Sequence, residues 1–163
     1  MYSNAQGLDP QFNGTLQSAG HPADPAIDVY REALHRLVKA KVPFLVGGTF
    51  ALESYTGLVR RTKDLDLFVN PVDRLRLMQR LSDAGFRTEW RFPHWLGKAN
   101  KDDRSIDIIY SSGNGICTVD EAWFRYALPA EIFGIPVQVV PAEEMLWSKA
   151  FVMERNRYDG GDI

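Results

Sequence analysis

The chain has 163 residues, the length of a single domain that buries a substantial core, with 45% hydrophobic and 25% charged residues. Its 19 Lys and Arg are outnumbered by 21 Asp and Glu, so the formal net charge of −2 does not favour a protein that binds long duplex nucleic acid. There is no membrane-length apolar run, no signal-peptide pattern and only one cysteine, Cys117, so we expect a soluble cytoplasmic protein without a disulfide or a membrane partner.

The first 25 residues differ in composition from the rest of the chain. They are rich in Gly, Pro, Asn, Gln and Ser and show no helical or strand period. We therefore predict a flexible N-terminal arm over residues 1–25 and one domain over residues 26–163. Apolar residues recur at helical spacing from Pro25 to Val38, which predicts the first helix of that domain.

The stretch 44–55 predicts a strand followed directly by a helix. A short apolar run at residues 44–46 stops at Gly47 and Gly48, and a helix-compatible segment begins at Thr49. The first amides of a helix have no intrahelical partner and lie at the positive end of its dipole, while glycine lets an anion approach the backbone. Gly47, Gly48 and Thr49 are therefore a candidate phosphate site.

Residues 64–69 predict a second strand that carries two carboxylates on one face. Because side chains alternate along a strand, Asp64 and Asp66 point to one side while Leu65 and Leu67 point to the other. Two carboxylates placed together resist double ionisation, and a divalent cation relieves the repulsion. Oxygen ligands of this kind suit Mg²⁺, which keeps several waters and binds substrate phosphates.

The rest of the chain predicts alternating helices and strands. Asn70-Pro71 begins a helix that ends near Gly85. The further expected elements are strands at 86–91 and 94–98, a strand at 104–110, a helix at 119–126 capped by Thr118 with Glu121 in a capping box, a hairpin at 131–140 turning near Gly134, and a helix from Pro141 to Arg155. The strand at 104–110 places Asp107 between two isoleucines, which makes it the candidate third carboxylate of the site.

The ordered set of Gly47-Gly48-Thr49, Asp64-Leu65-Asp66 and Asp107 resembles the polymerase-beta-like nucleotidyltransferase superfamily. The basic run at residues 60–63, just ahead of Asp64, is similar to the branch that holds small antibiotic-resistance nucleotidyltransferases and abortive-infection toxins. The resemblance covers about residues 30–160. It implies an α/β (α+β) fold, with a mixed twisted sheet and helices mainly on one face.

The same resemblance implies a reaction and its participants. A nucleoside triphosphate such as ATP donates a nucleoside monophosphate to a hydroxyl of a small molecule, an RNA or a protein, and pyrophosphate leaves. Two Mg²⁺ ions, or Mn²⁺ in their place, are expected at the site. Similar proteins continue into further helices, so the chain is expected to be truncated or a minimal version. An antitoxin-like protein partner is a further expectation from this branch.

Individual residues receive roles from the resemblance. Asp64 and Asp66 hold metal, and Asp107 shares the second ion or takes the acceptor proton. Arg61 or Lys63 meets a triphosphate oxygen, and Lys149 on the last helix meets the nucleotide. The alternative interpretation of the basic residues is a solvated loop, and that of Lys149 is an apolar stem with its charge in water.

Two other functional classes remain open at this point. One is a catalytically silent module that holds a nucleotide or a partner protein through the same surface. The other is phosphohydrolase-like metal chemistry on the same acids. By contrast, the scattered histidines give no zinc spacing, and neither a Gly-x-x-x-x-Gly-Lys-Ser/Thr loop nor a Gly-x-Ser-x-Gly elbow occurs in the sequence.

Overall fold

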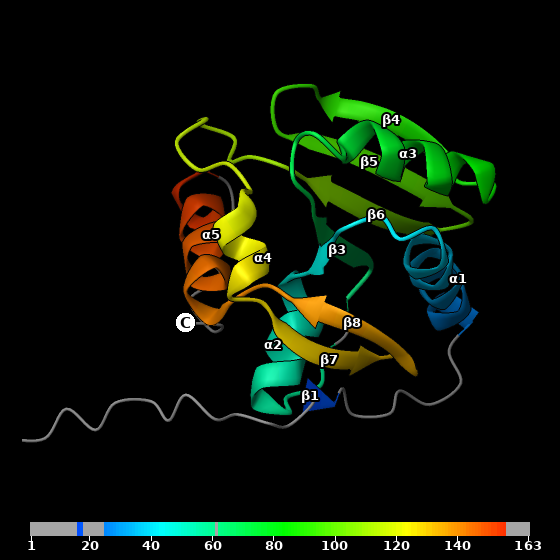
Figure 1. The fold of residues 1–163 in the computed structure, drawn as a ribbon, viewed down its shortest axis with the longest axis horizontal. Helices are drawn as coiled ribbons and strands as arrows, with labels where there is room; N and C mark the ends of the chain where they lie inside the picture. Colours follow the sequence, from blue (N-terminus) through cyan, green and yellow to red (C-terminus); the bar gives the residue numbers. More distant parts are fainter. Residues whose placement is uncertain (1–15, 18–24, 61, 156–163) are drawn as a thin grey trace, which may run out of the picture.

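The computed structural model describes residues 16–17, 25–60 and 62–155, and within them an eight-stranded mixed sheet in the order β1-β7-β8-β2-β3-β6-β5-β4 (Figure 1). The strands are β1 (Leu16–Gln17), β2 (Leu45–Val46), β3 (Asp64–Phe68), β4 (Arg87–Phe92), β5 (Leu96–Lys101), β6 (Arg104–Ile109), β7 (Leu128–Ile132) and β8 (Ile135–Val139). The helices are α1 (Pro25–Lys39), α2 (Gly48–Thr56), α3 (Arg74–Asp83), α4 (Glu121–Arg125) and α5 (Ala142–Arg155). The predicted fold class is confirmed.

The centre of the sheet is the predicted carboxylate strand, β3. It pairs antiparallel with β2 and parallel with β6, and β2 pairs parallel with β8. Leu65, Leu67 and Val69 are fully buried, as the alternation predicts. The short β2 leads directly into α2 through the glycine junction. This junction lies beside β3, since the Gly47 amide donates to the Asp66 carbonyl over 2.9 Å.

Helices α1 and α3 pack against each other and cover the apolar face of this half of the sheet. Leu67 lies opposite Ile108 on β6, and Ile108 lies opposite Gly97 on β5. A side chain on Gly97 would meet Met78 of α3 at 3.2 Å, so the row that contains Leu67 faces that helix. The opposite face of β3 is therefore the one that carries Asp64 and Asp66.

The predicted start of the fourth helix is wrong. The prediction placed Thr118 as its cap, but α4 begins at Glu121, and the carboxylate of Asp120 accepts the Ala122 amide over 2.8 Å. Thr118 instead forms a β-bridge with Ser111, and the Val119 amide donates to the Tyr110 carbonyl. Because Thr118 is held in extended structure by these contacts, the helix is capped two residues later by the Asp120 carboxylate.

Two other boundaries also move. Helix α3 begins at Arg74 rather than after Asn70-Pro71, because the Asn70 side chain and carbonyl bind the amides of Val72 and Asp73 in a turn. Strand β5 continues to Lys101, beyond the predicted end at residue 98, and two residues, Asp102 and Asp103, form its turn into β6.

Part of the predicted arm takes a defined place. Leu16 and Gln17 pair in parallel with β7 at the edge of the sheet. The rest of residues 1–24 and the last residues, 156–163, lie outside the described residues, so the flexible arm and the C-terminal truncation stay predictions. In the part of the chain that the structure describes, none of the helices has the length and apolar character needed to cross a bilayer.

The core makes a direct prediction for stability. Leu67→Ala should lower the free energy of unfolding by about 2 to 5 kcal/mol, because it leaves a cavity between the sheet and α3 at a fully buried position. Leu75→Ala on the outer face of α3, where the side chain is 64% exposed, is the matched control and should change stability by less than about 0.5 kcal/mol. Urea unfolding measures both, and equal losses in the two variants would contradict this packing.

Candidate active site

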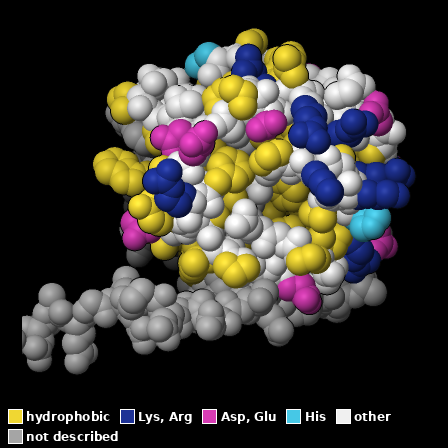
Figure 2. All heavy atoms as spheres, in the orientation of Figure 1, with side chains coloured by type: hydrophobic (Ala, Val, Ile, Leu, Met, Phe, Trp, Pro, Cys, Tyr) yellow, Lys and Arg dark blue, Asp and Glu magenta, His cyan; other side chains and the backbone are white. Residues whose placement is uncertain are grey.

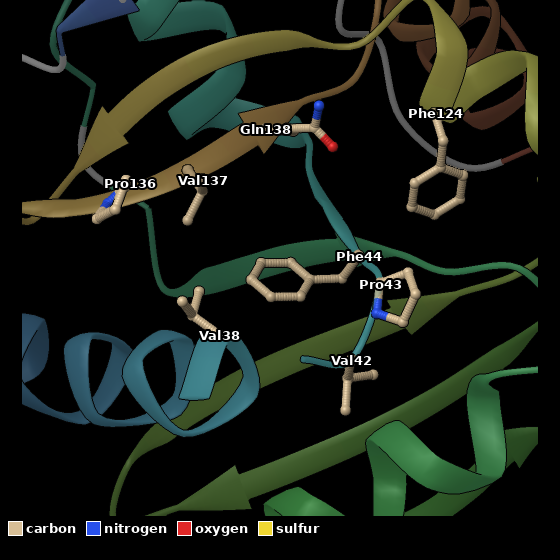
Figure 3. Close-up of a pocket in the computed structure, with 8 residues that line it drawn as sticks. All are labelled: Val38, Val42, Pro43, Phe44, Phe124, Pro136, Val137 and Gln138. Carbon is tan, nitrogen blue, oxygen red and sulfur yellow. The ribbon is translucent and has the colours of Figure 1, made fainter. Parts of the chain in front are cut away.

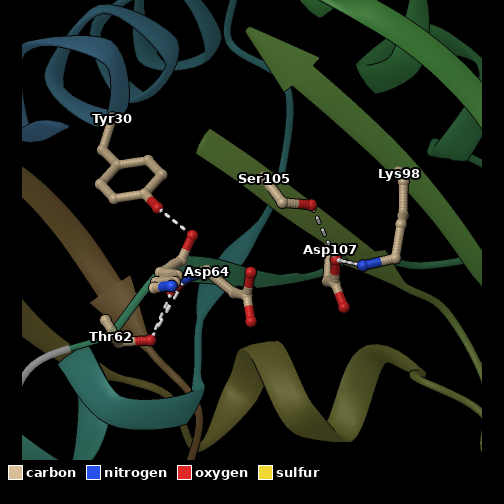
Figure 4. Close-up of polar contacts among 7 residues, drawn as sticks. Tyr30, Thr62, Asp64, Lys98, Ser105 and Asp107 are labelled. Carbon is tan, nitrogen blue, oxygen red and sulfur yellow. Dashed lines mark hydrogen bonds and ion pairs between the residues drawn. The ribbon is translucent and has the colours of Figure 1, made fainter. Parts of the chain in front are cut away.

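The structure brings the predicted carboxylates onto neighbouring strands and one face. Asp66 on β3 lies directly opposite Asp107 on β6 in the parallel pair, and Asp64 precedes Asp66 by two residues on the same face. Adjacent strands are about 4.8 Å apart, so the carboxylates of this row lie within reach of a shared ion or substrate. Figure 4 shows the side chains of Asp64 and Asp107 pointing into the same space.

A lysine that the sequence analysis did not select extends this row onto a third strand. Lys98 on β5 lies opposite Asp107, and its ammonium donates to Asp107 Oδ1 over 2.6 Å (Figure 4). The Ser105 hydroxyl lies 3.4 Å from the same oxygen. The Lys98 and Asp107 side chains are 27% and 20% exposed, so the pair is largely sheltered from water. One oxygen of Asp107 is thus already occupied.

The environment of Asp107 acts on its ionisation in two directions. Burial raises the pKa of the Asp107 carboxyl above its usual range, and the nearby Asp64 carboxylate raises it further. The hydrogen bond and charge of Lys98, with a smaller contribution from Ser105, lower the pKa and offset part of that rise. A carboxyl whose pKa is raised by burial and whose position is held by a cation is suited to accept a proton.

Two hydroxyls hold the backbone at the start of β3, where Asp64 lies (Figure 4). The Thr62 hydroxyl donates to the Asp64 carbonyl over 3.1 Å and accepts the Asp64 amide over 3.3 Å. The Tyr30 hydroxyl of α1 donates to the Lys63 carbonyl over 2.6 Å. Burial raises the pKa of Tyr30 to about 12, although the Arg104 guanidinium lowers it, so the phenol keeps its proton and remains a donor at neutral pH.

The glycine junction lies against the second carboxylate. Gly48, the first residue of α2, has a left-handed φ of +57°, and a Cβ built on it would lie 1.8 Å from Asp66 Oδ2. The helix has no side-chain cap at Gly47, so the backbone amides of its first turn need hydrogen-bond acceptors from other groups. The carboxylate of Asp66 and the positive end of α2 are therefore neighbours, an arrangement suited to an anion bridged to the carboxylates by a cation.

An aromatic pair forms one wall of the same face. Phe68, two residues after Asp66, stacks on Trp123 of α4 with ring centroids 5.3 Å apart. A Cβ on Gly47 would lie 2.3 Å from the Phe68 ring, so glycine at this position lets the ring pack against the strand-to-helix junction. This contact fixes α4 on the carboxylate face of the sheet.

The remaining predicted contacts are placed less completely. Thr49 is half-buried in the first turn of α2, and Lys63 is exposed immediately before Asp64. Lys149 belongs to α5, but its side chain lies outside the described residues, as does the whole of Arg61. Their contacts with a nucleotide stay predictions.

The donor set fits a magnesium ion held mainly by two carboxylates. As the described side chains stand, no three His, Cys, Asp or Glu residues among them are close enough to hold one ion together. Asp107 is engaged by Lys98. Asp64 and Asp66 are the residues that would hold Mg²⁺, with waters and phosphate oxygens as its other ligands.

Sequence reasoning overlooked Lys98, although a signal for it existed. A two-residue turn at Asp102 and Asp103 pairs Lys101 with Arg104, and counting back along that antiparallel pair places Lys98 opposite Asp107. Asp102 adopts the left-handed conformation with φ of +54° that such a turn uses. No comparable signal existed for Tyr30, which reaches the site from α1 across 33 residues of sequence.

An apolar depression of about 300 Å³ lies apart from the predicted site residues, between the end of α1, the start of β2, β8 and α4 (Figure 3). Val38, Phe44, Phe124 and Val137 are among its lining residues, and none of the lining residues is titratable. The depression therefore offers no acid, base or charged anchor for catalysis.

Comparisons with known proteins agree with this geometry at the level of fold. No protein-family model matches the chain, and no curated protein is similar to it in sequence. A crystal structure of ANT(2″)-Ia in complex with adenylyl-2″-tobramycin is similar with a TM-score of 0.65 and 19% identity, covering 86% of this chain and 82% of that one. The chain has the polymerase-beta-like nucleotidyltransferase fold.

Two further structures support the same assignment of the fold. A proposed nucleotidyltransferase from Thermotoga maritima is similar with a TM-score of 0.62 and 18% identity, covering 82% of this chain and 89% of that one. The lincosamide antibiotic adenylyltransferase LnuA, bound to lincomycin, gives a TM-score of 0.55 and 15% identity over 78% and 86%. The resemblance to the antibiotic-resistance branch stated from the sequence motifs is confirmed for the fold.

The close approach of Gly48 to Asp66 can be tested by substitution. Gly48→Ala should lower the free energy of unfolding by the cost of a left-handed alanine, roughly 1 to 2 kcal/mol, plus about 1 to 3 kcal/mol for overpacking against the carboxylate. The matched control is Gly57→Ala at the other end of α2, where φ is +71° and a Cβ meets nothing within 4 Å. Chemical unfolding of both variants measures the difference, and equal losses would show that the Gly48 contact is not tight.

Proposed function

We propose that the protein is a metal-dependent nucleotidyltransferase that moves a nucleoside monophosphate from a nucleoside triphosphate to a hydroxyl acceptor with release of pyrophosphate. The observation that carries the proposal is the row formed by Asp66 and Asp107 in register on parallel strands, with Asp66 against the uncapped start of α2. The proposal assigns to this row an anion site, a metal-binding carboxylate and a sheltered acid or base. The fold shared with adenylyltransferases supports the same conclusion.

Each residue then has a defined task. The amides of Gly48 and Thr49 at the start of α2 bind the triphosphate, and Gly47 leaves space at the junction. Asp64 and Asp66 would hold Mg²⁺, which would supply positive charge to the oxygens that become more negative during the displacement. With the leaving group held on the α2 side, the acceptor hydroxyl approaches from the β6 side, where Asp107 takes its proton.

The raised pKa of Asp107 supports this assignment of roles. Burial raises the pKa of the Asp107 carboxyl, whereas Asp64 lies at the exposed start of β3. A base with a raised pKa retains more driving force for proton abstraction than an ordinary aspartate. We therefore assign Asp107 to the acceptor proton, and Asp64 and Asp66 to metal and triphosphate.

The partners follow from charge and from the fold neighbours. We propose a nucleoside triphosphate, ATP among the candidates, and a hydroxyl acceptor on a small molecule, an RNA or a protein.

Figure 2 shows Lys and Arg side chains gathered on the side of the molecule where α1 lies, but on α1 itself Arg31 is paired with Asp28 and Arg36 with Glu32. With a net charge of −2, duplex binding should be weak and salt-sensitive. A cytoplasmic location and an antitoxin-like partner remain part of the proposal.

Transfer itself is tested by mass spectrometry of acceptors from a cell extract incubated with protein, Mg²⁺ and each common triphosphate. The expected result is an acceptor heavier by one nucleoside monophosphate, with pyrophosphate released. Asp107→Asn should lose at least about 100-fold in transfer rate, the usual contribution of a general base, while keeping nucleotide affinity better than Asp66→Asn does. Release of inorganic phosphate without acceptor labelling would indicate the phosphohydrolase chemistry instead, and wild-type transfer by Asp107→Asn would remove that residue from the site.

Binding is tested separately by thermal melting. Ligand that binds only the folded state at a hundredfold excess over its Kd adds about 2.7 kcal/mol, which raises the Tm of a domain of this size by about 5 to 10 °C. We expect that shift with Mg²⁺ and triphosphate together, a small shift with either alone, and none in Asp66→Asn. A joint shift without any transfer would favour the silent binding module, and no shift with any of the four common triphosphates would count against both functions.

A further inference from the structure

A tyrosine of α1 reaches both halves of the candidate site. Tyr30 is 2% exposed, and its hydroxyl donates to the Lys63 carbonyl over 2.6 Å, immediately before Asp64 (Figure 4). Its ring packs edge-on against Phe50 of α2, with ring centroids 6.0 Å apart. Phe50 follows Thr49 in the first turn of that helix. Tyr30 therefore links the segment that leads into β3 to the helix start that is the candidate phosphate site.

The start of β3 extends beyond its short neighbour β2. The two pairs of the β2–β3 ladder reach Phe68 and Leu67, and the Gly47 amide reaches the Asp66 carbonyl. Asp64 lies two residues further along β3, where the described part of the ladder to β2 has ended, and its strand partner is β6. The hydrogen bond from Tyr30 therefore supports a segment that is paired to the sheet on one side.

Aromatic packing fixes the phenol of Tyr30 in this position. Its ring stacks on Phe133 in the turn between β7 and β8, with centroids 6.4 Å apart and an angle of 17° between the planes. Phe50 packs edge-on against the same Phe133 ring at 5.0 Å. The three rings come from α1, α2 and the β7–β8 turn, so the direction of the Tyr30 hydroxyl is set by contacts that include α2.

We propose that Tyr30 is a positioning residue that sets the place of the Asp64 carboxylate relative to the start of α2, and thereby the affinity for a divalent cation together with a triphosphate. This inference rests on the proposed function, which assigns Asp64 to the metal and the start of α2 to phosphate. An ion that binds both the carboxylate and a phosphate oxygen requires the two positions to match. Tyr30 acts through the Lys63 backbone, without a contact of its own to the ion or the nucleotide.

The experiment removes the hydroxyl and keeps the ring. Free Mn²⁺ is measured by electron paramagnetic resonance during titration of the protein in the presence of a non-hydrolysable analogue of the triphosphate that gives the largest melting shift. Tyr30→Phe should bind Mn²⁺ with this analogue about three- to tenfold more weakly than the wild type does, the loss expected for one hydrogen bond. In the transfer assay, KM for the triphosphate should rise while kcat changes by less than about twofold, because the reacting groups are unchanged.

Tyr55→Phe is the matched control. The Tyr55 hydroxyl donates to the Val140 carbonyl over 2.8 Å, between β8 and α5, so this variant also loses one hydrogen bond to a backbone carbonyl. Burial raises the pKa of the phenol to about 12 in both tyrosines, and the carboxylates that raise it further in Tyr55 are Glu143 and Glu144 of α5. Urea unfolding should show similar losses of stability in the two variants, whereas the weaker binding should be confined to Tyr30→Phe.

A measurement on the wild-type protein tests the link without any variant. Amide hydrogen exchange in residues 62–66 and in the first turn of α2 should slow together when Mg²⁺ and the triphosphate bind. Slower exchange in one of these segments without the other would overturn the link between them.

The outcomes separate this inference from the proposed function. Unchanged binding in folded Tyr30→Phe, alongside a wild-type protein that transfers nucleotide, overturns the role of Tyr30 alone. Equal weakening in Tyr55→Phe overturns it as well, because the effect would then follow stability rather than position. A wild-type protein that binds neither Mn²⁺ nor triphosphate overturns the proposed function and this inference together.

Discussion

The parallel pairing of β3 with β6 is the constraint on which the rest of the site depends. It places Asp66 opposite Asp107 on one face and Leu65 and Leu67 opposite Ile106 and Ile108 on the other. The four apolar side chains are fully buried. A slip of one residue in either strand would turn its carboxylate into the core and its apolar residues toward solvent. Hydrophobic burial therefore fixes a register that places like charges next to each other despite their repulsion.

The protein offsets this repulsion with two different positive partners. Asp66 lies against the start of α2, where the helix has no side-chain cap at Gly47 and its dipole favours an anion. Asp107 is bound by the Lys98 ammonium and lies near the Ser105 hydroxyl. The two carboxylates of the row therefore differ in environment even though they occupy equivalent positions on adjacent strands. The proposed roles, one acid for metal and phosphate and the other for a proton, rest on this difference in environment.

Hydrogen bonds and aromatic packing support the site from the surrounding elements. Tyr30 ties the turn before β3 to α1, and Thr62 closes that turn on itself. Phe68 and Trp123 hold α4 on the carboxylate face. Because these contacts join the carboxylate strand to separate elements, the geometry of the site is coupled to the stability of the whole domain.

The sequence by itself determined the local elements, and with them the candidate acids. Period-two alternation in 64–69, the glycines after a short apolar run and an aspartate between isoleucines are local patterns, and the structure places β3, α2 and β6 where these patterns predict them. The prediction was wrong about the cap of α4, because Asp120 and Thr118 are both good caps and a bridge from Thr118 to Ser111, seven residues earlier, decided between them. Only the tertiary structure decided which strands are neighbours, that Lys98 pairs with Asp107, and that Tyr30 supports the turn before Asp64. The contacts of Lys98 and Tyr30 join residues 9 and 33 positions apart. Like the pairing of the strands, they depend on strand order and helix docking, which arise from the burial of the whole core rather than from any local pattern.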